Sequence, residues 1–532
     1  MKSKALAVLL AVVMGLGLCA CGSGSGSGSA APAGEAPAAE ASAEAGAEDS
    51  GEVYNVIMQI VTWGNEWPGI QDVEDAINAI TVPEIGVSVT MVPVAAWDLP
   101  TTSALQITSG EKLDLMCILP MGSGLDNIAN YSNKNMILPL NDLVAEYGQD
   151  ITSVLGENIN IGYVGETLYA ITPMNAVGAN YSFVARQKVL DELGYTFDEE
   201  TVYGLDTLDE LFAAYQEKYG DGYYPIAGFN NGELTTHLVA FDTLGGSSAT
   251  GVLKNAGLDD TTVVNRFATE EYRAACDKIR EWYLKGYINP DVLAITDTWV
   301  GLLETGNYLG AFSGVAGPFS LIGNENSMGE ELTAIRIIDD YATTSRASTA
   351  LWTIPTTCEN PEKTMQFLNL LYQERDRDVD IDTLITCGLE GVSYEVVEDL
   401  GGSEAIVRYP DGLNNATVPY TSALPIYGNG FTVPQYEPFT AEIEQMQKDY
   451  NQTIADKGRY SKAFGYTFDS SEYSNEIAAI NNVITQYEGM LGWGTVDVES
   501  TLAEFNSQLE AAGIDRVIEA NQQQLDAWLA LQ

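Results

Sequence analysis

The sequence predicts an α/β fold whose sheet is mostly parallel. Three observations support this prediction: strand-like and helix-like segments alternate after residue 52, the strand-like segments are almost continuously apolar, and hydrophobic residues make up 45% of the chain. Continuously apolar strands are typical of sheets covered on both faces, and single helices between successive strands are typical of parallel βαβ units. The length of 532 residues predicts two or three lobes.

The first elements of this fold alternate between strand and helix. We expect strands over 53–61, 87–94 and 114–119, and helices over 69–80 and 99–109. Parallel sheets bind ligands beyond the carboxyl ends of their strands. The loops that leave these ends cover residues 62–67, 95–97 and 120–124, so they are the first places to look for a binding site.

The second half of the chain is more helical. Thr207 and Glu210 have the spacing of a capping box that opens a helix reaching about Lys218. Residues 269–285 are amphipathic, and Asn360 is a predicted N-cap followed by proline and an acid. Apolar stripes with helical spacing then run from Ile477 to Leu491 and from Ile514 to Leu529, and they predict core packing.

The first twenty residues predict a secretory signal peptide. Two lysines precede an apolar run over residues 5–18, which is shorter than the roughly 20 residues that span a bilayer. Leu18, Cys19 and Ala20 then precede Cys21, which resembles a bacterial lipobox. The resemblance implies cleavage after Ala20 and attachment of diacylglycerol to Cys21. Cys19 fits this role less well, because Leu18 would occupy the position that needs a small residue.

Residues 21–52 predict a disordered tether. The segment begins with four Gly-Ser repeats and continues with alanine, proline and glutamate, a composition that cannot bury a core. Two acyl chains are enough for stable membrane anchoring. The sequence therefore predicts a folded body held on the extracytoplasmic face of a bacterial cell membrane through its lipid alone.

The charge balance excludes one class of partner. The chain has 24 lysines and arginines against 75 aspartates and glutamates, a formal net charge of −51. Because nucleic acid binding neutralises phosphates with basic side chains, nucleic acid is excluded. Adsorption to anionic lipid is disfavoured for the same reason, and repulsion between copies favours a monomer.

No motif for a metal or cofactor is present. The cysteines after Cys21 are widely spaced, so neither a zinc site nor a disulfide framework is predicted; a pair between Cys358 and Cys387 and buried free thiols both stay open. The acidic run over 376–382 lacks the glycine and glutamate of a calcium loop and is interpreted as a solvated loop before a helix. The remaining cysteines are Cys117 and Cys276.

The sequence nominates no catalytic residue. His237 is the only histidine, and no nucleophile motif accompanies it, so we interpret it as a cleft or core residue. A phosphate-binding loop and a His-Glu-x-x-His motif are absent. A glycosidase needs two nearby carboxylates, and no short motif selects a pair among 75 acids.

Aromatic residues and amides recur together in the predicted loops. Aromatic rings stack on the apolar faces of sugars while amides bind hydroxyls, so this composition favours a carbohydrate cleft. The residues concerned are Trp63, Trp67, Trp97, Phe229, Asn230, Trp299, Trp352, Tyr427 and Asn429.

Ordered stretches along the chain after the tether resemble the extracellular solute-binding proteins (family 1) of bacterial ABC importers. The match is to the large sugar-type lipoproteins of the LplA kind that carry a DUF3502 region. Ala350-Leu-Trp-Thr-Ile-Pro355 resembles a hinge crossing, and Gly465-Tyr-Thr-Phe-Asp469 through Trp528 resembles DUF3502. The other stretches are 109–115, 136–143, 165–171, 267–272, 282–291, 360–363 and 388–394.

The resemblance implies a two-lobed, periplasmic-binding-protein-like (type II) α/β fold with hinge crossovers. It assigns 53–175 and 313–350 to lobe 1, and 176–312 and 351–532 to lobe 2. Closure of the lobes captures a solute without breaking a bond. By resemblance, Trp63, Trp97, Asn175, Trp352 and Tyr427 line the cleft, and Arg186 is the one basic residue expected near it.

The predicted function is that of a substrate-binding lipoprotein of an ABC importer. It would capture a sugar or oligosaccharide and deliver it to membrane permease subunits, without catalysis and without a cofactor. Related proteins often take acidic aldouronates, but the scarcity of basic residues makes a neutral oligosaccharide an equal candidate. The alternatives are a surface-anchored polysaccharide-degrading enzyme and a receptor for a peptide or another solute.

Overall fold

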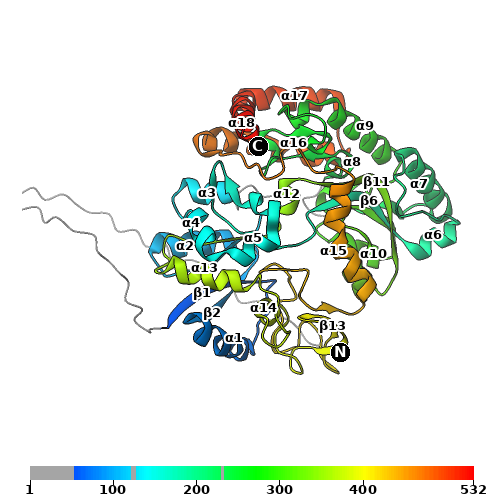
Figure 1. Cartoon of the computed structure of the whole chain (residues 1–532). Coiled ribbons are helices and arrows are strands. Elements are labelled where there is room, and N and C mark those ends of the chain that lie inside the picture. The colour runs from blue at the N-terminus through cyan, green and yellow to red at the C-terminus, as the bar shows by residue number, and fades with distance from the viewer. Residues whose placement is uncertain (1–52, 121–126, 229–232, 532) are drawn as a thin grey trace, which may run out of the picture. The chain divides into compact units, whose positions relative to one another are not determined.

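The computed structural model describes residues 53–120, 127–228 and 233–531 (Figure 1). The predicted signal peptide over 1–20, the tether over 21–52 with Cys21, and the candidates Phe229 and Asn230 lie outside the described residues. Within the described ranges, no helix combines the length and the apolarity that a membrane crossing needs.

The first sheet is the predicted βαβ unit. Strands β1 (Tyr54–Thr62) and β2 (Val87–Ala95) pair in parallel over their whole length, and helix α1 (Ile70–Ile85) connects them. Strand β3 (Met116–Ile118) lies on the other side of β1, through a parallel bridge between Met58 and Leu115. The alternation predicted from the sequence is therefore confirmed for these elements.

A distant segment completes this sheet. Strand β12 (Leu351–Thr353) pairs antiparallel with β3, and Ile171 forms a bridge with Trp352. The strand order is thus β2, β1, β3, β12. The first core packs around it and includes side chains from four helices: α4 (Asn141–Tyr147), α5 (Gln149–Leu155), α13 (Pro361–Leu370) and α14 (Ile381–Cys387).

The second sheet has four strands in the order β11, β6, β10, β7. The central strands β6 (Gly178–Arg186) and β10 (Tyr308–Val315) are antiparallel; β11 (Leu332–Ala342) is antiparallel to β6, and β7 (Tyr224–Ile226) is parallel to β10. Separate apolar clusters include Phe183 and Val184, which are neighbours on β6 and so face opposite sides of the sheet. Burial on both faces explains the apolar run over residues 183–185 of β6.

Helices form a third cluster beside this sheet. The C-terminal helices α16 (Ser474–Gly492), α17 (Val498–Ala512) and α18 (Ile514–Leu529) pack with α9 (Glu270–Leu284). In Figure 1, α17 and α18 are red and α9 is green. Their shared core contains the predicted apolar stripes, so the interpretation of those stripes as core packing is confirmed.

Three connections join the two sheets in the described part of the chain. They run between Ile171 and β6, between β11 and β12, and between the short strand β15 (Gln435–Tyr436) and α15 (Ala441–Asp456). Both α15 and Tyr460 contact β11. The two α/β lobes and the hinge crossovers of the predicted type II fold are therefore present.

The packing differs from the predicted segment boundaries. Residues 313–342, expected in lobe 1, continue β10 and β11 and hydrogen-bond to β6 of the second sheet. Residues 351–436, expected in lobe 2, pack through β12, α13 and α14 into the first core. Short apolar strands fit either core, so only their partners decide the side on which they lie.

Local capping signals were predicted with mixed success. Thr269 accepts from the amide of Tyr272, and Asn360 accepts from that of Lys363, as expected of N-caps. Helix α7 (Leu205–Tyr219) begins two residues before the predicted start, so Thr207 lies inside its first turn and no capping box forms there. Asp380 caps α14, so a loop does precede a helix here, but the interpretation of 376–382 as a solvated loop is wrong for its end, because Asp380 and Asp382 are buried and residues 381–382 belong to α14.

The remaining helices and strands are short or connect the two sheets. Their bounds are α2 (Leu99–Ser109), α3 (Ile128–Asn133), α6 (Gln187–Leu193), α8 (Thr235–Leu238), α10 (Trp299–Glu304), α11 (Ile322–Met328), α12 (Thr344–Ala347), β4 (Tyr163–Val164), β5 (Thr167–Leu168), β8 (Phe241–Asp242), β9 (Leu253–Lys254), β13 (Glu395–Gly401) and β14 (Glu404–Arg408).

Candidate functional site

The carboxyl ends of β1, β2 and β3 lie at one edge of the first sheet. Neighbouring strands are about 4.8 Å apart, so the loops that follow them are adjacent. Trp63 follows β1, Trp97 follows β2, and Leu119 and Pro120 follow β3. Two cavities border this edge, which is where a sheet of this kind binds ligands.

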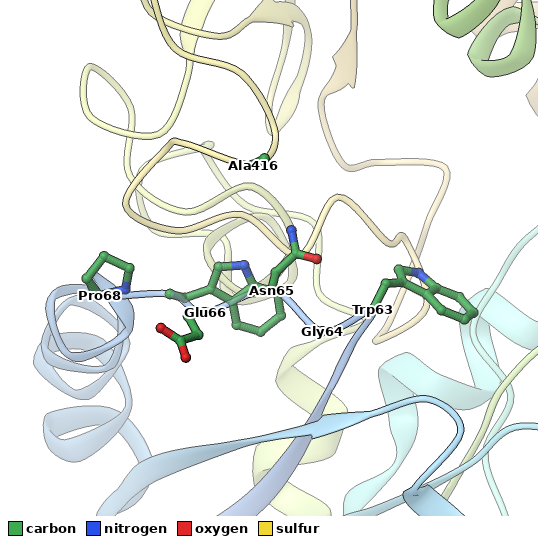
Figure 2. Close-up of a pocket in the computed structure, with 7 residues that line it drawn as sticks. Trp63, Gly64, Asn65, Glu66, Pro68 and Ala416 are labelled. Carbon is green, nitrogen blue, oxygen red and sulfur yellow. The ribbon is translucent and has the colours of Figure 1, made fainter. Parts of the chain in front are cut away.

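The first cavity, called here the outer cavity, has a volume of about 730 Å³. Figure 2 shows that the loop after β1 forms most of it: Asn65 projects toward the side of Ala416, and Glu66 projects away from it. The complete lining is Trp63, Gly64, Asn65, Glu66, Trp67, Pro68 and Ala416.

Two tryptophans at this end of the sheet are exposed. Trp63 is 51% and Trp97 62% exposed, and their ring centroids are 6.5 Å apart with planes inclined at 43°. The loop is held by Thr62, whose hydroxyl accepts from the amides of Gly64 and Asn65 at 2.9 Å. Gly64 has a φ of +91°, a value that side chains disfavour. The two rings form an apolar surface open to solvent, as stacking on a sugar requires.

The second cavity, called here the inner cavity, has a volume of about 470 Å³ and draws on both lobes. The first lobe contributes Pro120, Asn127, Ile128 and Ile161, and the connection between β11 and β12 contributes Ser345, Ser348 and Leu351. The second lobe contributes Glu233, Thr236, His237, Thr243, Gly245, Gly246, Ser247, Ser248, Ala249, Arg266, Thr467, Asn481, Ile484 and Glu488.

Hydrogen bonds tie the walls of the inner cavity together. The Asn127 amide donates to the carbonyl of Gly245 at 3.1 Å, from the first lobe to the second. The hydroxyls of Thr243 and Ser345 are 2.7 Å apart, and the Gly245 amide donates to Ser345 at 3.1 Å. A side chain at Gly245 would collide with Thr467. The inner cavity is therefore lined by hydroxyls and amides at the point where the lobes meet.

A buried ion cluster forms one wall of the inner cavity. The Arg266 guanidinium, 3% exposed, donates through Nη2 to Glu233 at 2.7 Å and to the Thr235 hydroxyl at 2.8 Å. Its Nη1 donates to Glu488 at 3.0 Å and to the Ser248 hydroxyl at 3.2 Å. Two carboxylates thus share one guanidinium.

The two carboxyl groups differ in acidity. Burial opposes ionisation of Glu233, but the charge of Arg266 and hydrogen bonds from Thr235 and Arg266 outweigh it, so the pKa of Glu233 is lowered. Burial, together with the charge of Glu233, raises the pKa of Glu488 to about 7. Burial also lowers the pKa of His237, against the charge of Glu233. At neutral pH the Glu233–Arg266 pair is therefore ionised and Glu488 is partly protonated.

Three predicted site residues are buried in the first core instead. Trp352 is fully buried, donates through Nε1 to the carbonyl of Ile426 at 2.6 Å, and lies 5.4 Å from the ring of Tyr427. Tyr427 is also fully buried and shares a 2.6 Å hydrogen bond with Ser422. Trp67 packs against Tyr420, although its edge borders the outer cavity. Trp352 and Tyr427 therefore present no surface to a solute here, because segments distant in sequence cover them.

Four further predicted residues line neither cavity. Asn175 donates to the carbonyl of Pro425 at 2.7 Å, and Asn429 accepts from the amide of Phe431, so both support the turn over residues 425–431. Arg186 forms a two-nitrogen ion pair with Glu330 at 2.9–3.2 Å. Trp299 begins α10 and packs in the second lobe.

Sequence reasoning did not select the ion cluster. Arg266, Glu233 and Glu488 are separated by up to 255 residues, so no spacing motif joins them. The one available signal was that Arg266 stands next to the resembling stretch that begins at Phe267. His237 lines the inner cavity, which agrees with the interpretation of it as a cleft residue.

The described residues offer no cluster of acids, histidines and cysteines that could hold a metal ion. Cys358 and Cys387 are not joined by a disulfide bond. Of the two possibilities left open for Cys358 and Cys387, the structure therefore has unpaired thiols.

Comparisons with known proteins find a matching domain model and a similar curated protein. Residues 462–530 match the model of a domain of unknown function, DUF3502, which covers α16 to α18. A carbohydrate ABC transporter substrate-binding protein of Streptococcus pneumoniae is 23% identical over 91% of this chain and 92% of its own length.

Solved structures share the fold. The N-glycan transport solute-binding protein NgtS of Streptococcus pneumoniae superposes with a TM-score of 0.72 at 20% identity, over 90% of this chain and 99% of that one. NgtS has also been crystallised with Man1GlcNAc. An ABC-transporter-associated solute-binding protein of Bifidobacterium longum infantis superposes with a TM-score of 0.60 at 12% identity, over 90% and 99% of the two chains. The chain therefore contains a DUF3502 region, shares the two-lobed fold of these solute-binding proteins, and is similar over nearly its whole length to a carbohydrate ABC transporter substrate-binding protein.

Proposed function

We propose that this chain captures an oligosaccharide between its two lobes and delivers it to the permease subunits of an ABC importer. The observation that carries the proposal is the inner cavity, which takes its walls from both lobes and from the connection between them. A solute held there contacts both lobes at once, so it stabilises the closed arrangement over an open one.

The lining suits a sugar. The inner cavity presents serine and threonine hydroxyls, the amides of Asn127 and Asn481, and two carboxylates, all of which bind hydroxyl groups. The outer cavity adds the exposed ring of Trp63, and the exposed ring of Trp97 lies 6.5 Å from it, outside the lining. The inner cavity thus has polar groups, and the outer cavity has a stacking surface beside it. This combination fits an extended, hydroxyl-rich ligand better than an apolar one. The related NgtS binds glycans, which supports this class of solute.

The membrane attachment of the receptor rests on Cys21. We propose that diacylglycerol on this cysteine and the tether over 21–52 hold the folded body near its permease as a monomer, on the extracytoplasmic face of the membrane. Replacing Cys21 by serine should move the protein from the membrane fraction to the soluble extracytoplasmic fraction, because the acyl chains are lost. Cell fractionation measures this change, and Cys19→Ser is the matched control. Membrane retention of the Cys21→Ser protein would refute the anchor.

The binding function is tested with purified protein lacking residues 1–21. A thermal-shift screen against neutral and acidic oligosaccharides and against peptides should find a stabilising sugar. A ligand at 100 times its dissociation constant adds about 2.7 kcal/mol to the free energy of unfolding. If no sugar stabilises the protein, the proposal of a sugar receptor is contradicted. Stabilisation by peptides alone would identify a peptide as the solute.

One observation favours a second candidate, a polysaccharide-degrading enzyme. Glu233 and Glu488 border one cavity with pKa values shifted in opposite directions, as in general acid–base pairs. Both carboxylates, however, accept from the same guanidinium, which fixes their positions and disfavours proton transfer from or to either group. Incubating the stabilising glycan with the protein and analysing the products separates the two functions: shortened glycan indicates an enzyme, and intact glycan a receptor.

The stacking surface gives a direct prediction. Replacing Trp97 by alanine should weaken binding of the stabilising oligosaccharide about tenfold, since one aromatic contact contributes about 0.5–1.5 kcal/mol. The melting temperature should stay unchanged, because the ring is 62% exposed. Isothermal titration calorimetry measures the affinity. Leu105→Ala removes a side chain of the same lobe that is 63% exposed and serves as control. Equal affinity of the Trp97→Ala and wild-type proteins would remove the tryptophan pair from the site.

A further inference from the structure

We infer that the inner cavity selects uncharged, hydroxyl-rich glycans and rejects glycans that place a uronic acid carboxylate in it. This inference rests on the proposed function and narrows its solute class. A receptor for acidic sugars needs an arginine or lysine whose donors face the solute, because carboxylates are recognised by paired N–H donors. Such a group is missing from the described lining of this cavity.

Arg266 is the one arginine or lysine in that lining, and the protein itself occupies it. A guanidinium has five N–H donors. Two of those on Arg266 bind Glu233 and Glu488, and two bind the hydroxyls of Thr235 and Ser248. The fifth, on Nε, is buried without a hydrogen-bond partner among the described residues. Arg266 therefore has no pair of donors to offer a solute carboxylate.

The other cationic groups near this cavity are also engaged. Burial lowers the pKa of His237, so its ring is neutral at pH 7. The Arg346 guanidinium lies 4.3 Å from the ring centroid of Tyr181 and 4.7 Å from that of Tyr341, and it is not part of the lining. Arg186, which the sequence nominated, is paired with Glu330.

The charge balance of the lining also disfavours a solute carboxylate in the inner cavity. Two carboxylates face one guanidinium, so a negative charge remains whenever Glu488 is ionised. A solute carboxylate here would meet repulsion at low dielectric constant and would lose its hydration without a compensating partner. A sugar hydroxyl meets the opposite situation: it can donate to Glu488, to serine and threonine oxygens, or to Asn481. The side-chain amide of Asn481 has no hydrogen bond to another described residue.

The experiment uses the wild-type protein without its anchor segment and two defined sets of glycans. The neutral set is Man1GlcNAc, kestose and xylotriose; the acidic set is trimannuronate, trigalacturonate and an aldotetraouronic acid. Calorimetry at pH 8 should find binding in the neutral set and at least a 30-fold weaker affinity for every acidic glycan. An acidic glycan that binds as tightly as the best neutral one overturns the inference and leaves the receptor function standing. If no glycan of either set binds, the result counts against the receptor function itself.

A charge variant then tests the cause. Glu488→Gln keeps the size and a hydrogen-bonding oxygen but removes the excess charge, so the ratio of the affinity for acidic glycans to the affinity for neutral glycans should rise at least tenfold. Glu510→Gln, an exposed acid on α17 outside the lining, is the matched control and should change neither affinity. Equal responses of the two variants overturn the inference.

A pH series provides the same test without a substitution. Glu488 has a pKa of about 7, and the charged groups that act on it are Glu233 and Arg266; Tyr272 nearby stays neutral, because burial raises its pKa well above the ordinary value. Lowering the pH from 8 to 6 protonates Glu488 while uronates stay ionised. Affinity for acidic glycans should therefore increase about threefold to tenfold in the wild-type protein, and affinity for neutral glycans should not. A wild-type acidic affinity that is independent of pH contradicts the assignment of the excess charge to Glu488.

Discussion

Replacing Trp352 by alanine is expected to lower the free energy of unfolding by about 3–5 kcal/mol, the usual loss for a buried tryptophan. Trp352 is fully buried, it lies against Tyr427, and its indole donates to the carbonyl of Ile426. The substitution leaves a cavity in the first core and an unpaired carbonyl. Urea denaturation followed by circular dichroism measures the change.

Trp97→Ala is the matched control for this prediction. The same side chain is removed, but from a position that is 62% exposed, so stability should change by less than about 0.5 kcal/mol. If Trp352→Ala instead left stability intact and reduced only glycan affinity, Trp352 would be a ligand contact, as the family resemblance implied. The pair of variants thus separates core packing from solute stacking for one residue type.

Replacing Arg266 by methionine is expected to lower the free energy of unfolding by about 3–5 kcal/mol, because it leaves the buried Glu233 and the partly buried Glu488 without their counter-charge. Arg273→Met, on the solvent side of α9, breaks an exposed pair with Asp277 and should cost less than about 1 kcal/mol. Thermal and urea denaturation measure both. Combining Arg266→Met with Glu233→Gln and Glu488→Gln should recover most of the loss, since no charge then stays buried.

The loss at Arg266 should also depend on pH. Glu488 has a raised pKa of about 7 against an ordinary value of 4.5, so the stability that its protonated form contributes is complete below about pH 4.5 and is lost as pH rises through 7. Without Arg266, protonation becomes still more favourable for both carboxyl groups. The destabilisation measured for Arg266→Met should therefore be smaller at pH 5 than at pH 8. An equal loss at both values would mean that the two acids are not the cause.

Much of the first lobe could be predicted from local patterns. The strands ending at Thr62 and Ala95 and the helices between them follow from runs of apolar residues and from 3.6-residue spacing, which depend on neighbours in the chain. The predicted cap at Asn360 follows from a hydrogen bond that spans three residues. Trp63 and Trp97 were placed at strand ends for the same reason, and the structure leaves both exposed.

Contacts between distant segments could not be predicted in this way. The strand Leu351–Thr353 is equally apolar whichever sheet it joins. In the structure it pairs antiparallel with β3, with Trp352 opposite Cys117. Whether a tryptophan is a stacking surface or a core residue depends on what covers it. For Trp352 the cover comes from Ile426 and Tyr427, more than 70 residues away.

The sequence by itself determined the α/β class, the family resemblance, the excess of acid over base and the tryptophans at the strand ends. These properties follow from composition and from periodicity along the chain. Only the tertiary structure decided which rings stay exposed and that Arg266 is already neutralised by Glu233 and by Glu488, which is 222 residues away. The physical reason is that burial and charge pairing depend on distance in space, and the fold sets that distance independently of position in the sequence.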